Sequence, residues 1–133
     1  GKRVAYMNQF ASEMLAHGLT IAEQFKAAAA VAPPQFSCMD MLVEFGLGLQ
    51  NRGNAFVGHL SGGERQIIAL LCTLAAGAAI LCLDEFTSAL DEKSAYIADR
   101  LLEYVKRTSK VALVVVSHSG PLVQIDREIR MTG

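Results

Sequence analysis

A strand–helix–strand pattern in the second half of the chain constrains the fold most strongly. Two apolar runs, "AILCLDE" at Ala79–Glu85 and "KVALVVVSH" at Lys110–His118, enclose the amphipathic segment "EKSAYIADRLLEYVKRT" at Glu92–Thr108. Continuous apolar runs are typical of parallel strands that are buried on both faces, and a helix is their usual connection. The sequence therefore predicts a parallel βαβ unit and an α/β fold.

Further elements are expected before this unit. "RVAYMNQ" at Arg3–Gln9 begins with a short β-prone run. Thr20, with Glu23 three residues later, has the spacing of a capping box for a helix that Pro33-Pro34 would end. "FSCMDMLVEFGL" at Phe36–Leu47 predicts a second helix from its apolar stripe. A longer helix is expected from Ser61 to about Gly77, and since it is apolar on nearly all sides it should be buried.

Composition excludes several classes of protein. The 133 residues fit one domain, with 52% hydrophobic residues, 19% charged residues and a formal net charge of −1. No basic stripe accompanies this charge, which argues against nucleic acid as a partner. The three cysteines, an odd number without CxxC spacing in apolar surroundings, predict buried structural thiols in a reducing compartment, which we take to be the cytoplasm. No apolar run approaches the length of roughly 18 residues that a membrane span needs.

Asp84 and Glu85 stand where the first apolar strand is predicted to end. Ligand sites in open parallel sheets lie at the carboxyl ends of the strands. One carboxylate there can hold a hydrated Mg²⁺ while its neighbour orients or deprotonates a water molecule. The pair is explained equally well by the preference for acidic residues near the start of the following helix. His118 ends the next strand and would lie beside the carboxylates, although a single histidine is more often a surface or core residue.

The segment "LSGGERQ" at Leu60–Gln66 has the character of a phosphate-binding helix N-terminus. Ser61 can cap the helix, the two glycines allow a close approach of the backbone to an anion, and the first N–H groups carry a partial positive charge. The simpler explanation is an N-cap after a glycine turn, with Glu64 completing a capping box.

Taken together, these segments resemble the nucleotide-binding domain of an ABC-type ATPase. "LSGGERQ" matches the family signature, "AILCLDE" the Walker B strand, "TSALD" the D-loop, and "VVVSHS" the segment with the switch histidine. "YMNQ" resembles the Q-loop, with Gln9 as its glutamine. The resemblance implies a P-loop NTPase-like parallel sheet within one partial domain at 1–133. It comprises a Q-loop strand at 1–10, a helical subdomain at 11–54 and a catalytic core at 55–133.

The resemblance also implies the roles of the site residues. Asp84 would hold Mg²⁺ and Glu85 would polarise the hydrolytic water. Gln9 would sense both the metal and the water, and His118 would contact the γ-phosphate of ATP. Two domains of this family enclose ATP head to tail, so Asp91 would organise the facing subunit. The residues that would bind the γ-phosphate of the partner's nucleotide are Ser61, Gly62, Gly63 and Glu64.

The sequence departs from the family in one major respect, because it contains no GxxxxGK[ST]. Backbone N–H groups and the lysine of that motif hold the phosphates of ATP. We therefore expect a truncated domain that binds Mg-ATP poorly and is inactive alone. The strand that would carry this motif is also missing, which predicts an open apolar edge at Lys110–Val116, covered by a last strand near Glu128–Met131 or by a second chain. Phe86 stands where the family usually has proline, and Cys72 where it commonly has arginine.

Two other functions remain open at this stage. One is a non-enzymatic interaction module that presents the signature face to a partner ATPase. The other is the C-terminal lobe of a chromosome-maintenance or DNA-repair ATPase, against which the absence of a heptad segment and the neutral charge argue. Our reading is the ATP-binding subunit of an ABC transporter. Its expected partners are a second nucleotide-binding domain and a transmembrane subunit, at the cytoplasmic side of the membrane.

Overall fold

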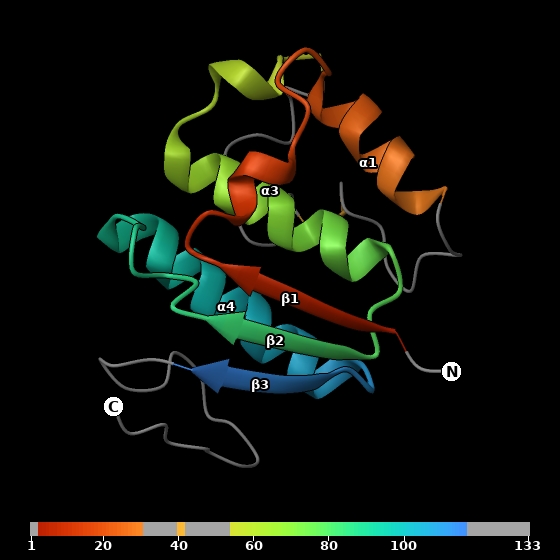
Figure 1. Cartoon of the computed structure of the whole chain (residues 1–133), viewed down its shortest axis with the longest axis vertical. Helices are drawn as coiled ribbons and strands as arrows, with labels where there is room; N and C mark the ends of the chain where they lie inside the picture. Colours follow the sequence, from red (N-terminus) through yellow and green to blue (C-terminus); the bar gives the residue numbers. More distant parts are fainter. Residues whose placement is uncertain (1–2, 31–39, 42–53, 117–133) are drawn as a thin grey trace.

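A computed structural model describes residues 3–30, 40–41 and 54–116 of the chain (Figure 1). Its sheet contains three parallel strands in the order β1-β2-β3, formed by Val4–Asn8, Ile80–Asp84 and Ala112–Val116. Helix α4, Glu92–Thr108, connects β2 to β3. The predicted parallel βαβ unit is therefore present, and its helix has the predicted bounds.

The register aligns the carboxyl ends of all three strands. Asn8 pairs with Asp84, and Asp84 pairs with Val116. Because parallel strands end at the same edge, the segments that follow β1 and β2 begin side by side. This alignment places Gln9, directly after β1, near the two acidic residues Asp84 and Glu85.

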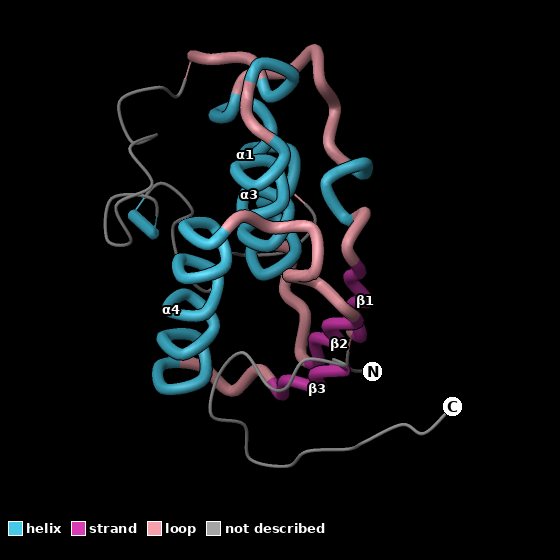
Figure 2. Tube along the Cα trace, turned by 90° about the vertical axis from the view of Figure 1, so that its left-hand side faces the viewer, coloured by secondary structure: helices cyan, strands magenta, loops and turns pink. Residues whose placement is uncertain are grey.

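The described helices lie on one side of the sheet (Figure 2). Helix α3, Gly62–Ala75, packs against both α4 and α1, Ile21–Ala29. Strand residues that face these helices are buried, among them Met7, Leu81, Leu83 and Val115. They belong to one apolar core that also includes side chains of α1, α3 and α4.

The opposite face of the sheet corrects a sequence-based expectation. The two apolar runs predicted strands buried on both faces, yet on this face Ala112 of β3 is exposed, and Val4 and Tyr6 of β1 are 63% and 60% exposed. Period-2 alternation puts Cys82 on this same face, and its side chain is only half-buried. The prediction of a buried thiol is confirmed for Cys72 and wrong for Cys82, while Cys38 lies outside the described residues.

Helices α1 and α3 begin at capping boxes, as their sequences predict. Thr20 caps α1 with Glu23, and Ser61 caps α3 with Glu64. Nine of the 14 residues of α3 are buried, which confirms that this helix belongs to the core. It ends before Gly77, whose φ of 88° is a conformation that glycine adopts without strain.

Two short 3₁₀ helices, η1 at Ala11–Met14 and η2 at Val57–His59, adjoin the helical part. Thr20 and Phe56 form an isolated antiparallel bridge. Ile21 N–H donates to the carbonyl of Ala55 at 3.0 Å, and Val57 N–H donates to the carbonyl of Leu19 at 2.9 Å. These bonds hold residues 19–21 against residues 55–57.

The predicted open edge at Lys110–Val116 is confirmed for the described residues. Strand β3 is last in the order β1-β2-β3 and pairs with β2 along Ala112 to Val116, so its other side pairs with no described strand. Several expected features lie outside the described residues, namely Pro33-Pro34, His118, the strand near Glu128–Met131, and all of the second helix except Asp40 and Met41. None of the described helices combines the length and apolar character of a membrane span.

Candidate functional site

A cavity of about 230 Å³ lies at the carboxyl ends of β1 and β2. It brings together three of the predicted site residues, Gln9, Asp84 and Glu85. Its complete lining is Tyr6, Asn8, Gln9, Phe10, Asp84 and Glu85. Most of these side chains offer oxygen atoms, so the cavity has the chemistry of a site for a hard cation.

Asp84, at the end of β2, is held by a tyrosine of the neighbouring strand. The hydroxyl of Tyr6 donates to Oδ2 of Asp84 at 2.5 Å. Tyr6 pairs in register with Cys82, so its side chain leaves the sheet on the same face as Asp84. The hydrogen bond to Asp84, followed by desolvation, raises the pKa of Tyr6 above 10.0. Tyr6 was not among the residues singled out from the sequence, because only strand pairing brings it to Asp84.

Glu85 follows with an unusual backbone conformation, a φ of 53°. Its N–H donates to the carbonyl of Val116 at 2.9 Å, and its carbonyl accepts from the N–H of Ser88 at 3.2 Å and from the Ser88 hydroxyl at 2.9 Å. Helix α4 begins only at Glu92, beyond a turn. The alternative explanation of Asp84 and Glu85 as charges in the first turn of the next helix is therefore wrong.

Gln9 faces the same cavity and is tied to the loop after β2. The hydroxyl of Ser88 donates a short hydrogen bond to Oε1 of Gln9. Within the described part of the chain, no group of three or more His, Cys, Asp or Glu residues is placed to hold a metal. Mg²⁺ commonly takes one or two carboxylates and completes its shell with phosphate and water oxygens. The carboxylate of Asp84 and the amide oxygen of Gln9 fit that kind of site.

Ser61, Gly62, Gly63 and Glu64 lie outside this cavity, at the start of α3. The Ser61 hydroxyl accepts from the Glu64 N–H at 3.1 Å, and Oε1 of Glu64 accepts from the Ser61 N–H at 2.9 Å. The capping explanation of this segment is thus confirmed. Ser61 and Gly62 are exposed, and a Cβ at position 62 would meet no atom of the described residues within 4 Å. This helix end is therefore open to a ligand or a partner.

Asp91 packs against the same helix end from the other side. It is the N-cap residue of α4, and a Cβ built on Gly63 would lie 2.9 Å from its Oδ1. A hydrogen bond with the side chain of Ser94 is the main cause that lowers the pKa of Asp91 below 3.8. The start of α4 thus lies directly against the start of α3, with Gly63 at the contact.

Gln66 is a functional candidate that the sequence reasoning missed. Its side chain is 2% exposed and contacts the segments that carry Gln9 and Glu85. The available signal was a polar residue at the head of an apolar helix, since Ile67 to Cys72 are all apolar and buried. His118, the remaining predicted residue, lies outside the described residues, which end at Val116 beside Glu85.

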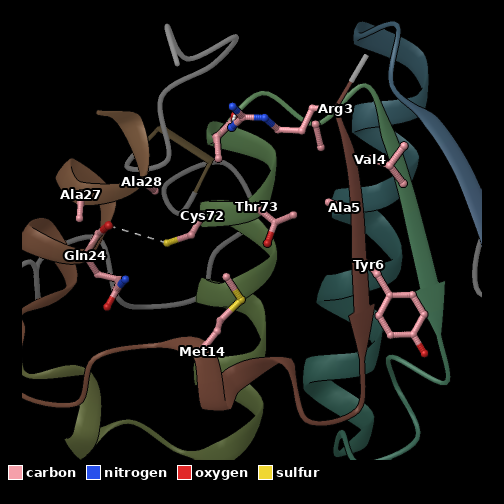
Figure 3. Close-up of a pocket in the computed structure, with 12 residues that line it drawn as sticks. Arg3, Val4, Ala5, Tyr6, Met14, Gln24, Ala27, Ala28, Cys72 and Thr73 are labelled. Carbon is pink, nitrogen blue, oxygen red and sulfur yellow. Dashed lines mark hydrogen bonds between the residues drawn. The ribbon is translucent and has the colours of Figure 1, made fainter. Parts of the chain in front are cut away.

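A second cavity, of about 420 Å³, lies between β1, α1 and α3 (Figure 3). Figure 3 shows Thr73 of α3 on the side of β1 and Cys72 pointing toward Gln24 of α1, while Val4 and Tyr6 project to the far side of the strand. The Sγ atom of Cys72 lies 4.0 Å from the carbonyl oxygen of Gln24. The lining is mostly apolar and contains none of the predicted site residues.

Comparison with known proteins agrees with this geometry. The chain is 41% identical over 86 residues to the lipoprotein-releasing system ATP-binding protein LolD of Bordetella pertussis, an alignment that covers 64% of this chain and 37% of LolD. It is 35% identical over 86 residues to the methionine import ATP-binding protein MetN of Corynebacterium diphtheriae, covering 65% of this chain and 25% of MetN. The chain therefore spans only about a third of the length of these relatives.

A solved structure and a family model complete the comparison. An ABC transporter in an inward-facing conformation superposes with a TM-score of 0.66 at 21% identity, over 89% of this chain and 49% of the other. This likeness establishes a partial P-loop NTPase-like fold. The family model described as ABC transporter matches residues 1–88. On these grounds the chain belongs to the ABC transporter family of ATP-binding proteins.

Proposed function

We propose that the chain is part of an ATP-hydrolysing subunit of an ABC transporter. The supporting observation is the oxygen-lined cavity that holds Gln9, Asp84 and Glu85 together. Asp84 and Gln9 would bind Mg²⁺, which neutralises charge on the transferred phosphoryl group. Glu85 orients and polarises the water that attacks the γ-phosphate, and His118 contacts that phosphate from the segment after β3.

The signature half of the site would act on a second nucleotide-binding domain. Ser61 and Gly62 are exposed and lie outside the cavity of Asp84, which favours an anion presented by another molecule. Free N–H groups and the helix dipole at this end of α3 stabilise a phosphate. Gly63 and Glu64 support this end by packing and capping, and Asp91 organises the facing subunit from the start of α4.

A polypeptide of these 133 residues alone is expected to bind Mg-ATP weakly and not to turn it over. Asp84 and Glu85 would present like charge to the triphosphate, and the sequence offers no GxxxxGK[ST] to hold it. In the assembled transporter the subunit would lie at the cytoplasmic face of a transmembrane partner. The exposed signature end equally favours a second candidate, a non-enzymatic module that completes or blocks the site of a partner ATPase.

A calorimetric titration of Mg-ATP tests the proposal. The chain is titrated alone, and then mixed with an intact nucleotide-binding domain that carries a hydrolysis-blocking substitution. We expect no measurable heat from the chain alone and an ATP-dependent complex in the mixture. Ser61→Arg should abolish that complex, while Ala22→Arg on the exposed surface of α1 serves as the matched control.

The outcomes separate the candidates. Tight binding by the chain alone would contradict the proposed need for a phosphate cradle. A mixture that forms no complex at any ATP concentration would contradict both functions of the signature end. If the chain changes the ATPase rate of an active partner and Ser61→Arg removes the effect, the interaction module is supported.

A further inference from the structure

Gln66 is the most deeply buried polar side chain in the described part of the chain, where Ser94 is the other buried polar residue. A buried amide costs free energy unless its donors and acceptor are satisfied. Gln66 satisfies them with backbone groups from three separate segments. Its position one turn into α3, directly before the buried residues Ile67 to Cys72, makes it a fixed point.

The hydrogen bonds of Gln66 are well formed. Nε2 donates to the carbonyl of Asn8 at 2.8 Å and to the carbonyl of Phe86 at 3.2 Å. Oε1 accepts from the N–H of Ser12 at 2.9 Å. One side chain therefore joins the end of β1, the start of η1 and the loop after β2.

The three partners are significant because of the residues beside them. Asn8 immediately precedes Gln9, and Phe86 immediately follows Glu85. Gln9 and Glu85 are thus each one residue away from a backbone carbonyl that accepts a hydrogen bond from the Gln66 side-chain amide. The ring of Phe86 is 1% exposed, so the loop after β2 is anchored by packing as well as by this bond.

The backbone of Glu85 needs such support. A residue other than glycine at positive φ costs of order 1–3 kcal/mol and persists only when its surroundings over-determine it. The Glu85 N–H is bound by the carbonyl of Val116, and its carbonyl by Ser88. Gln66 Nε2 donates to the next carbonyl, that of Phe86, and so restrains the peptide that follows Glu85.

We propose that Gln66 is a positioning residue that holds Gln9 and Glu85 in register with each other and with the signature helix. The part of this inference that concerns hydrolysis rests on the proposed function. The part that concerns geometry does not. A shift of about 1 Å in a reacting group can lower a rate by about 10²-fold, so loss of this register is expected to act on the chemical step.

Gln66→Glu is the sharpest test variant, because the two side chains have the same shape. A carboxylate can still accept from Ser12, but it cannot donate to Asn8 or Phe86. Gln24→Glu is the matched control. The side-chain Oε1 of Gln24 accepts a hydrogen bond from the Ala16 N–H at 3.0 Å, and a carboxylate can retain this bond. Both variants add one negative charge to a helix.

The first readout is amide hydrogen exchange in the 133-residue chain. For Gln66→Glu we expect at least tenfold faster exchange at Glu85 and Ser88, with rates in the middle of α4 unchanged. Gln24→Glu should leave Glu85 and Ser88 at their original rates. Equal exchange in the two variants would overturn the geometric part of the inference.

The second readout is ATP hydrolysis by the protein assembled with its native partner subunits, with the rate expressed per bound ATP so that unfolded molecules do not count. Gln66→Glu should lower kcat about 10²-fold, with KM for ATP changed less than threefold. Unchanged kcat would overturn the inference. An unmodified complex that hydrolyses no ATP would instead overturn the proposed function, and the exchange experiment would still decide the geometry.

A measurement on the unaltered chain covers the case in which Gln66→Glu does not fold. In NMR spectra the two side-chain amide protons of Gln66 should be protected from exchange with solvent and should show contacts to Asn8 and Phe86. The side-chain amide of Gln24 provides the internal comparison. Rapid exchange of the Gln66 amide, at the rate of Gln24, would overturn the inference.

Discussion

Gly63→Ala tests how the starts of α3 and α4 pack around Asp91. A methyl group at position 63 would lie 2.4 Å from Oγ and 2.9 Å from Cβ of Ser94, and 2.9 Å from Oδ1 of Asp91. Ser94 is 7% exposed and belongs to the first turn of α4, so it cannot rotate freely into solvent. The first turn of α4 must therefore shift away from α3.

The magnitude follows from two opposing effects. Overpacking of this kind costs about 1–3 kcal/mol. Replacing glycine by alanine in a helix increases the free energy of unfolding by up to about 1 kcal/mol. We expect a net destabilisation of about 1–2 kcal/mol. Gly62→Ala, where the added carbon has no atom of the described part of the chain within 4 Å, should instead be neutral or stabilising by a few tenths of a kcal/mol.

Urea denaturation of the two variants measures the difference. The midpoint should fall for Gly63→Ala and stay level or rise for Gly62→Ala, with an unchanged slope in both. Ser94→Gly in the Gly63→Ala background removes two of the three close atoms and should recover part of the loss. If both alanine variants shift the midpoint equally, the close contact between α3 and α4 is refuted.

Two further predictions concern the pH dependence of single groups. The folded-state pKa of Tyr6 is raised, so the stabilisation from its bond to Asp84 is complete below about pH 10 and is lost as the pH rises through the raised value. In an ultraviolet titration of the tyrosine hydroxyls, Tyr6→Phe should remove the step at the highest pH. Burial, and then the charge of Glu103, raise the pKa of Asp99, whose Oδ1 has no hydrogen-bond partner among the described residues. Asp99→Asn should therefore raise the urea midpoint at neutral pH and lose this advantage below about pH 3, where the unaltered carboxyl is protonated in both states; an advantage that persists in acid would exclude the electrostatic explanation.

The sequence predicted those helices and strands well whose signals come from residues within the same segment. The capping boxes at Thr20 and Ser61 and the amphipathic period of α4 depend on residues within one or two helical turns. The apolar runs likewise predicted β2 and β3. They could not show which neighbours would cover the sheet, and for that reason the prediction for Cys82 was wrong.

The candidate site was predictable in part. Asp84 and Glu85 were predictable because they stand at the end of an apolar strand, where open parallel sheets place their ligand sites, whereas Gln9 was predicted only from the resemblance of "YMNQ" to the Q-loop. Tyr6 and Gln66 were missed because their contacts are not local. The bond from Tyr6 to Asp84 spans 78 residues, and the bond from Gln66 to Asn8 spans 58. A polar residue heading a buried helix is the one sequence signal that pointed to Gln66.

The strained backbone of Glu85 connects these contacts to the chemistry. A residue held at positive φ by Val116, Ser88 and Gln66 gives the glutamate a direction that a regular strand end would not provide. Glu85→Gly and Glu85→Ala both remove the carboxylate, so comparing them isolates the backbone. Alanine costs about 1–2 kcal/mol in the left-handed region, whereas glycine adopts it freely. Glu85→Gly should therefore be more stable than Glu85→Ala by about 1 kcal/mol in urea denaturation. This order is the reverse of that in a helix or strand, and finding alanine the more stable variant would show that Glu85 is not held at positive φ.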